Sequence, residues 1–276
     1  MAGNNDSDSD FLLDEILPFP SPFPHSNKVF VTLTYAQTLN GCIGEKIKNR
    51  PLIISGEKSL EMTHQLRAIH DGILVGVNTL IQDNPRLNSR IKNEDRFLKK
   101  LKEITNGDEK YLGSHQPIPI ILDSELKCPI DSKFLAVEKE NEIKGVIFCH
   151  LNANQENQDK LEKVGVKVIR IPFDSENRLC LHQVLENLYT LGIKTLMVEG
   201  GSKVITSFLK NQLADRIIVT IAPFFYGGLN LFDSSLFVKT NDNSLIQAKV
   251  SLQEMVMKKL ENDFVISGIP KFDIVA

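Results

Sequence analysis

The sequence predicts an α/β fold with a mostly parallel central sheet, flanking helices and a C-terminal antiparallel hairpin. Short apolar runs alternate with segments of helical length in the second half of the chain, which is typical of parallel sheets covered by helices on both faces. Two of the apolar runs end in polar turns that contain glycine, at 76–90 and 199–202. Near the C-terminus, two stretches rich in β-formers flank the short turn 261–263, as in a hairpin.

The individual elements follow from residue patterns. The stretch 29–35 is rich in β-formers and precedes a turn at 38–41, so it predicts the first strand. Residues 52–54 form a short extended piece, and apolar residues at helical spacing predict a helix over 58–70. Further strands are expected at 118–122, 145–149, 166–171, 195–198 and 216–221, helices at 154–164, 179–191 and 202–210, and hairpin strands at 250–260 and 264–269.

Two segments depart from this pattern. Residues 1–27 hold five acids, no Lys or Arg, and four alternating prolines, so they predict an acidic, Pro-rich tail before a single domain over 28–276. The favoured interpretation is an undocked tail; the alternative is docking through Phe11, Leu12, Phe19 and Phe23. The charged stretch 91–116 is interpreted as an insertion that carries a short exposed helix.

Composition excludes several classes of protein. The net charge is −3 for the whole chain, so beyond the tail it is +2, and no basic stripe of the kind that binds nucleic acid is present. No apolar run approaches the roughly 20 residues that a membrane span needs, and the N-terminus lacks the features of a secretory signal. The four cysteines lie far apart without a C-x-x-C pair, which favours a reduced, cytoplasmic protein without a metal site.

The most informative stretch is 71–90, DGILVGVNTLIQDNPRLNSR. A buried strand leads through Gly76 into a polar segment, where Thr79 and Asp83 lie one helical turn apart and can face one ligand. Plain turn chemistry is the alternative for the residues around Asp83. Arg67 and Arg90 are candidates for binding a phosphate, because a guanidinium matches phosphate geometry, although single arginines are usually solvated.

The second informative turn is Glu199-Gly200-Gly201-Ser202. The two glycines allow backbone N–H groups to approach a ligand, and the helix that follows offers uncapped donors suited to a phosphate. Capping of that helix by Ser202 is the structural alternative. An acid such as Glu199 at the end of an apolar strand needs a partner or a ligand. Together, the two turns predict a ligand cleft at the carboxyl edge of the sheet.

Other motifs fail. Gly56-Glu57-Lys58-Ser59 lacks the adjacent Gly-Lys of a P-loop and has Pro51 where its first glycine would stand. No G-x-G-x-x-G follows a strand, no G-x-S-x-G is present, and the histidines lack metal-ligand spacing. No H-x-E followed by P-C-x-x-C is present, so zinc deaminase activity is excluded.

Five motifs in order resemble one family. They are TLTYAQTLNGCIG (32–44), DGILVGVNTLIQDNPRLNSR (71–90), IPIILDS (118–124), VEGGS (198–202) and IIVTIAPFFYGG (217–228). Together they resemble the riboflavin-biosynthesis reductases, meaning the fungal and archaeal diaminohydroxyphosphoribosylaminopyrimidine reductases and the reductase half of the bacterial deaminase-reductase. The resemblance spans about 29–269. Asn40-Gly41 stands where relatives often have Asp-Gly, and Ile53 falls near a tryptophan of the bacterial members.

This resemblance implies a dihydrofolate-reductase-like fold, a homodimer and NADPH as cofactor. Its substrate is 2,5-diamino-6-ribosylamino-4(3H)-pyrimidinone 5′-phosphate, whose ribosyl group is reduced to ribityl before deamination. Arg67, Leu87, Arg90 and Glu199 are expected to contact the substrate. The expected cofactor contacts are Ala36, Thr79, Asp83, Ser124, Gly200, Gly201, Ser202, Lys203 and Val204, within a turn that extends to Ser207.

The expected reaction is hydride transfer to sugar C1′ of a ring-opened imine. Glu199 is the expected catalytic residue, which hydrogen-bonds the substrate and assists proton movement to the ring oxygen or imine nitrogen. Arg170 and Lys203 are the candidates for binding the 2′-phosphate of NADPH. Two alternatives are kept: a reductase of another pterin or pyrimidine such as dihydrofolate, and a non-catalytic NADPH-binding regulator.

Overall fold

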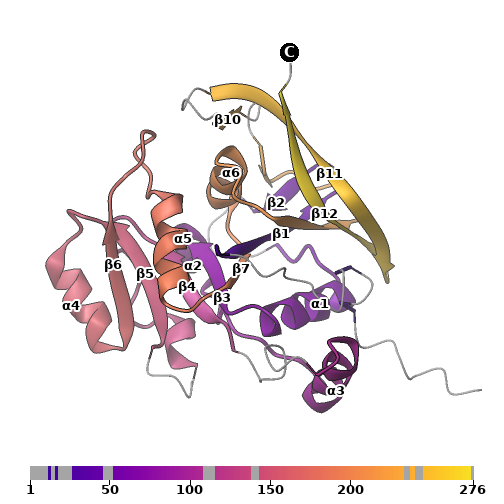
Figure 1. The fold of residues 1–276 in the computed structure, drawn as a ribbon, viewed down its shortest axis with the longest axis horizontal. Helices are drawn as coiled ribbons and strands as arrows, with labels where there is room; N and C mark the ends of the chain where they lie inside the picture. The colour runs from indigo at the N-terminus through magenta and orange to yellow at the C-terminus, as the bar shows by residue number, and fades with distance from the viewer. Residues whose placement is uncertain are drawn as a thin grey trace, which may run out of the picture.

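In the part of the chain that the structure describes, seven parallel strands form most of one sheet, and three antiparallel strands extend one of its edges (Figure 1). The computed structural model describes residues 12–13, 16–17, 27–45, 52–107, 116–137, 143–232, 237–239 and 245–274. The strand order is β10-β11-β12-β8-β1-β7-β3-β4-β5-β6. The predicted fold class, α/β with a mostly parallel sheet, flanking helices and a C-terminal antiparallel hairpin, is therefore confirmed.

Most predicted elements are present, with ends that shift by one to a few residues. The extended piece expected at 52–54 forms no strand. The strands are β1 Phe30–Thr38, β2 Cys42–Gly44, β3 Gly72–Gly76, β4 Ile118–Leu122, β5 Gly145–His150, β6 Val166–Ile171, β7 Thr195–Val198, β8 Arg216–Ala222, β9 Leu229–Asn230, β10 Phe237–Lys239, β11 Leu245–Leu260 and β12 Asp263–Ile274. The helices are α1 Glu57–Ala68, α2 Val77–Asp83, α3 Glu94–Ile104, the 3₁₀ helix η2 Lys133–Ala136, α4 Gln155–Lys163, α5 Leu181–Thr190 and α6 Ser202–Lys210.

Alternation along the strands supplies a core on each face of the sheet. Val31 and Leu33 of β1 pack with the apolar residues of α5 and α6, whereas Phe30 packs on the opposite face with α1. The same alternation places Leu74 of β3 with α5 and α6, and its neighbour Ile73 with α2 and α4. Burial on both faces explains why these strands are nearly continuous apolar runs.

The topology brings distant turns together at one edge. β1 lies between β7 and β8, and β7 lies between β1 and β3, all parallel. The register pairs Leu74 with Val198, so Gly76 and Glu199 both leave the sheet at its carboxyl edge. Ligands of open parallel sheets bind at such an edge.

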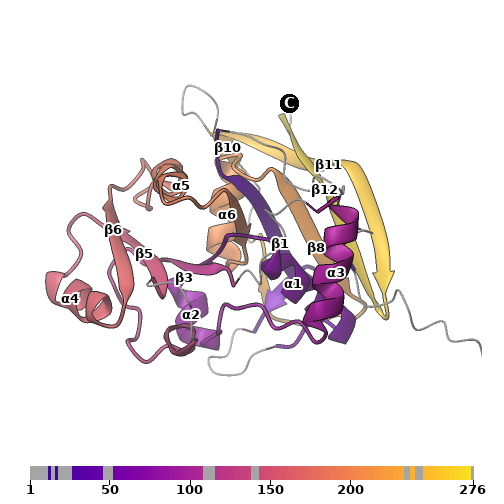
Figure 2. The same ribbon diagram turned by 60° about the horizontal axis from the view of Figure 1, so that its bottom comes forward.

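The C-terminal hairpin is longer than predicted. β11 and β12 pair along most of their length and turn at 261–262, with one register shift between Gln253 and Val256. Figures 1 and 2 show this hairpin as a long ribbon at the far end of the sheet from β6. No helix among the described residues is long and apolar enough to cross a membrane.

Part of the N-terminal tail is docked. Leu12, Leu13, Ile16 and Leu17 are buried in a cluster with α1 and α3, and the Leu12 amide donates to Oε1 of Gln65 at 2.9 Å. These four positions support the docked alternative, although Phe11, Phe19 and Phe23 lie outside the described residues. The insertion helix α3 is likewise not wholly exposed, because its residues Phe97 and Leu101 are buried in the same cluster; α1 and α3 lie side by side in Figures 1 and 2.

Truncation of Leu13 tests this docking. The Leu13 side chain is 0% exposed, so Leu13→Ala is expected to lower the free energy of unfolding by about 2–4 kcal/mol. Urea unfolding measures the change, with Leu151→Ala as the matched control, because Leu151 is 51% exposed. A change below about 0.5 kcal/mol for Leu13→Ala would contradict the docking, since that is the size expected of a surface substitution.

Candidate active site

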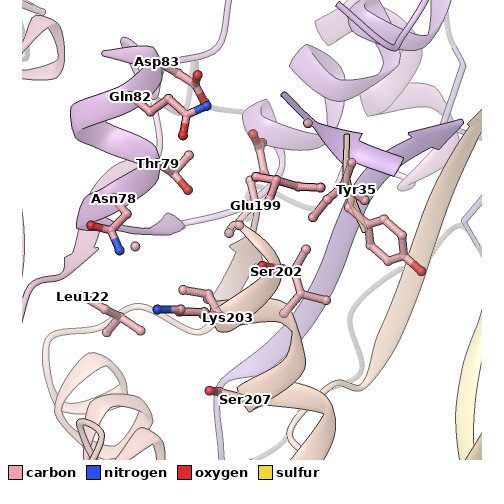
Figure 3. A pocket seen from close by; sticks show the side chains of 18 of the residues that line it. Tyr35, Asn78, Thr79, Gln82, Asp83, Leu122, Glu199, Ser202, Lys203 and Ser207 are labelled. Atoms are coloured by element: carbon pink, nitrogen blue, oxygen red, sulfur yellow. The ribbon is translucent and has the colours of Figure 1, made fainter. Parts of the chain in front are cut away.

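A cleft of about 1070 Å³ opens at the carboxyl edge of the parallel strands (Figure 3). Its lining comes from the ends of β1, β3, β4 and β7, and from the N-terminal turns of α2 and α6. Most of the predicted site residues lie in this lining: Ala36, Arg67, Thr79, Asp83, Ser124, Glu199, Gly200, Gly201, Ser202, Lys203 and Val204.

An ion pair between Arg67 and Glu199 occupies one end of the cleft. Arg67 Nε donates to Glu199 Oε1 at 2.7 Å, and Arg67 Nη2 donates to Oε2 at 2.6 Å. The two side chains are 13% and 16% exposed, so little water competes with this bidentate contact. Burial acts to lower the pKa of Arg67, but the charge and hydrogen bonds of Glu199 outweigh it and raise that pKa. The acid that the sequence left without a partner is therefore held in one orientation.

The loop after α2 brings further positive charge to this end. Asn84 ends α2 in the left-handed region, with φ 41°, and Arg67 Nη1 donates to the carbonyl of Asn88 at 3.2 Å. Arg90 Nη1 donates to Asn88 Oδ1 at 2.8 Å. Burial lowers the pKa of Arg90 most, and the nearby positive charges of Arg67 and Arg86 lower it further. An anion bound here would relieve that repulsion.

Two predicted substrate residues lie outside the lining of the cleft, namely Leu87 and Arg90. Arg90 is exposed, and it lies close enough to Arg67 and Glu199 for their charges to affect its pKa. Leu87 has φ 50° and a side chain that is 1% exposed, packed in the core beneath α2. Only the backbone of Leu87 can therefore meet a ligand.

His64 lies beneath the same arginines. It is 7% exposed, its ring hydrogen-bonds the backbone of Asn88, and its Nδ1 has no hydrogen-bond partner among the described residues. Burial, Arg67 and Arg90 lower the pKa of His64 to about 4. Neutral His64 thus supports the loop without adding charge to the two arginines.

This histidine predicts an acid-dependent loss of stability. The pKa of His64 is 6.5 in the unfolded reference and about 4 in the fold, so between these values only the unfolded chain binds the proton. The free energy of unfolding is therefore expected to fall by about 1–2 kcal/mol from pH 7 to pH 5 through His64 alone. Urea unfolding at pH 7 and pH 5 measures this change in the free energy of unfolding. His64→Gln should lose the part of the pH dependence that His64 contributes, whereas His182→Gln, at an exposed position, should retain it. Equal slopes in the two variants would contradict the assignment.

The turn at the start of α6 has the form of an anion site. Gly201 is the N-cap, and no side chain caps the helix, so Ser202 is the first helical residue and not the cap that the structural alternative required. A Cβ on Gly200 would lie 2.4 Å from Cβ of Val204, and one on Gly201 would lie 3.1 Å from Oγ1 of Thr79. Close approach therefore requires glycine at position 200, whereas a Cβ at position 201 would make the Thr79 hydroxyl shift slightly; both glycines line the cleft.

The predicted pairing of Thr79 and Asp83 is helical, because both belong to α2. Figure 3 shows them on the side of the cleft opposite α6, together with Asn78 and Gln82. Burial raises the pKa of Asp83 above its ordinary value. The plain turn chemistry considered for Asp83 therefore applies to Asn84 instead.

Several lining residues gave no signal in the sequence. Tyr35, in the second half of β1, is largely buried, and burial raises its pKa to about 12. Glu45 is buried and accepts a hydrogen bond from the hydroxyl of Tyr226. Arg178 and Ser207 line the opposite end of the cleft. Of these residues only Ser207 was expected, as the last residue of the predicted cofactor turn that begins at Gly200.

Arg170, one of the two residues expected to bind a 2′-phosphate, is committed elsewhere. Its guanidinium donates to Gln158 Oε1, Gln155 Oε1 and the carbonyls of Leu151 and Ala153, at 2.7 to 3.0 Å. It ties β6 to α4 and does not line the cleft. Among the described residues, no group of His, Cys, Asp and Glu could hold a metal ion.

Known proteins resemble this chain over most of its length. The family model described as RibD C-terminal domain matches residues 29–266. The 2,5-diamino-6-ribosylamino-4(3H)-pyrimidinone 5′-phosphate reductase of Debaryomyces hansenii is 34% identical over 78% of this chain and 81% of its own. The reductase of the same name from Archaeoglobus fulgidus is 30% identical over 72% of this chain and 82% of its own.

A bacterial relative and a solved structure extend the comparison. The riboflavin biosynthesis protein RibD of Aquifex aeolicus is 35% identical over 84% of this chain, which corresponds to only 54% of that longer protein. The structure of the riboflavin biosynthesis reductase Rib7 of Saccharomyces cerevisiae superposes with a TM-score of 0.66 at 25% identity, and the alignment covers 92% of this chain and 96% of that one. Sequence and fold therefore point to the same set of relatives.

Proposed function

The chain belongs to the RibD C-terminal domain family, and from this premise we propose that it reduces the ribosyl group of 2,5-diamino-6-ribosylamino-4(3H)-pyrimidinone 5′-phosphate with NADPH. Such an enzyme is an oxidoreductase of riboflavin biosynthesis. One observation carries the proposal beyond resemblance: the Arg67–Glu199 pair and the uncapped start of α6 line a single cleft. One end of that cleft suits a polar substrate, and the turn of α6 suits a pyrophosphate.

The residues of the cleft fit a nicotinamide dinucleotide. Ser202 and Lys203 in the first turn of α6 line the cleft and no side chain caps the helix, so a pyrophosphate could accept from their N–H groups. Thr79 Oγ1 lies beside Gly201, where it can add a hydroxyl donor. We assign Ala36, Thr79, Asp83, Ser124 and 200–204 to the cofactor. When bound, NADPH supplies the hydride that reduces the sugar at C1′.

The chain itself positions the substrate. Glu199 accepts two hydrogen bonds from Arg67, and its position in the lining lets it accept further hydrogen bonds from a substrate hydroxyl or amine. We assign Glu199 as the residue that contacts the reacting sugar, opened to an imine, and that assists proton movement there. Arg90 and Arg67 supply the positive charge for the 5′-phosphate, and the backbone of Leu87 borders that group.

Two other functions remain as alternatives. A reductase of dihydrofolate or another pterin would use the same cofactor turn, and a non-catalytic regulator would need only that turn. The gathering of Arg67, Arg86 and Arg90 favours a phosphorylated substrate over both, because a regulator without a substrate has no need of these cations.

We also propose a cytoplasmic homodimer. The four cysteines are unpaired, as expected of a protein from a reducing compartment. β11 and β12 carry exposed apolar side chains, because Met255, Val256, Met257 and Phe264 are 40% to 61% exposed. Exposed apolar side chains of this kind are a candidate subunit contact. Light scattering coupled to size exclusion tests the assembly, because the monomer has a mass of 31.0 kDa and the proposal requires twice that value.

The function is tested by product analysis. Purified protein receives NADPH and freshly generated pyrimidinone phosphate, with dihydrofolate as the parallel substrate. We expect one NADPH to be consumed for each pyrimidine that gains two hydrogens, and no consumption with dihydrofolate. Reduction of dihydrofolate alone would support the first alternative. Tight NADPH binding without reduction of either substrate would support the regulator.

A further inference from the structure

The cleft has a second cationic end, remote from the Arg67–Glu199 pair. The start of α6 lies between the two ends, so a dinucleotide with its pyrophosphate there must extend in both directions. The nicotinamide has to meet the substrate near Glu199, which leaves the opposite end for the adenosine. That end is lined by Leu122, Ser124, Ser207 and the loop 173–179 between β6 and α5.

Arg178 is fixed at this end by α6. Its Nη1 donates to Ser207 Oγ at 2.6 Å, which links two segments 29 positions apart in the chain. Arg178 is exposed, and no carboxylate among the described residues lies within salt-bridge distance of it. Its remaining N–H groups are therefore available to an anion in the cleft.

Lys203 joins the same group from α6. It lies one helical turn before Ser207, and Figure 3 shows both side chains on the side of α6 that faces Leu122. The lining here also includes Asp174, whose Oδ1 accepts from the backbone N–H groups of Glu176 and Arg178. Because this carboxylate accepts hydrogen bonds from the backbone of its own turn, it stabilises the conformation of the loop that carries Arg178.

We propose that Arg178 and Lys203 together bind the 2′-phosphate of the cofactor's adenosine, and that Arg178 is the residue that makes the enzyme select NADPH over NADH. The inference rests on the proposed function, since it assumes a dinucleotide in the cleft. The guanidinium, held by one hydrogen bond, matches the geometry of a phosphate, and the ammonium in the same lining adds the second positive charge that a phosphate dianion requires. NADH has a hydroxyl at this position and would gain little from either cation.

Binding of two nucleotide fragments tests the inference without any turnover. Calorimetry compares adenosine 2′,5′-bisphosphate with adenosine 5′-monophosphate on wild type, Arg178→Gln, Arg178→Lys and Lys203→Gln. Arg178→Gln is expected to weaken the bisphosphate by about 10- to 100-fold and the monophosphate by less than about 3-fold. Arg178→Lys should recover part of the loss. Lys160→Gln on α4 is the matched control, since it removes an exposed charge that pairs with Glu156.

The outcomes separate this inference from the function on which it rests. Equal binding of the two fragments by wild type, or an equal loss for both in Arg178→Gln, would overturn the 2′-phosphate subsite. Preference for the bisphosphate that depends on Arg178 would support it, even if the pyrimidine is not reduced, and the error would then lie in the substrate. In active enzyme, the ratio of kcat/KM for NADPH to that for NADH should fall in Arg178→Gln and stay unchanged in Lys160→Gln.

Discussion

Replacing Arg67 with methionine is expected to lower kcat/KM by about 100-fold or more and the free energy of unfolding by about 2–4 kcal/mol. The side chain of Glu199 is only 16% exposed in the wild type, and the substitution removes the two hydrogen bonds that orient its carboxylate. It also removes the donor to the Asn88 carbonyl that ties the 84–90 loop to α1. Urea unfolding and steady-state kinetics measure the two effects.

A double variant isolates the pair. Arg67→Met combined with Glu199→Leu removes both charges, so it is expected to recover part of the lost stability and none of the lost activity. Additive losses of stability in the double variant would show that the two residues act independently. That result would contradict the role of the pair as one unit.

Replacing Glu199 with glutamine is expected to lower kcat by about 100-fold, while the affinity for NADPH stays within about 3-fold of wild type. Glutamine keeps the shape of Glu199 but replaces one of its two acceptor oxygens with an NH2 group, which cannot accept a hydrogen bond from Arg67 or from the substrate. Single-turnover kinetics measures the chemical step, and fluorescence titration measures cofactor binding.

The matched control is Glu186→Gln, which makes the same chemical change on α5, outside the lining of the cleft. It should leave both quantities unchanged. Full turnover with tight substrate binding in Glu199→Gln would remove Glu199 from the chemistry, and Arg67 would then serve only to organise the cleft.

The parallel part of the fold could be predicted because its signal is local. Strand β4 and helix α6 form at the predicted residues, since an unbroken apolar run or a helical period decides each within a few positions. Strand order could not be obtained in this way. The placement of β1 between β7 and β8 depends on pairings between residues more than 150 positions apart.

The same contrast between local and long-range features holds for the site. The glycine turn after β7 was identified because its function requires particular residue types in sequence. The pairing of Arg67 with Glu199 joins positions 132 residues apart, and no spacing rule anticipates it. Arg178 was missed because one exposed arginine in a loop is indistinguishable by sequence from a solvated one. The docking of Leu13 was missed because the surrounding prolines and acids are typical of free tails.

In the proposed reaction the cleft holds the nicotinamide against the substrate's sugar, so that hydride passes directly between them. NADPH carrying deuterium at nicotinamide C4, in each stereochemical form, would be used for reduction of the pyrimidinone phosphate, and the product would be analysed by mass spectrometry and NMR. One of the two forms is expected to place a single deuterium at C1′ of the ribityl chain. Product without deuterium from both forms would contradict direct transfer, and with it the arrangement of substrate and cofactor derived from Glu199 and the start of α6.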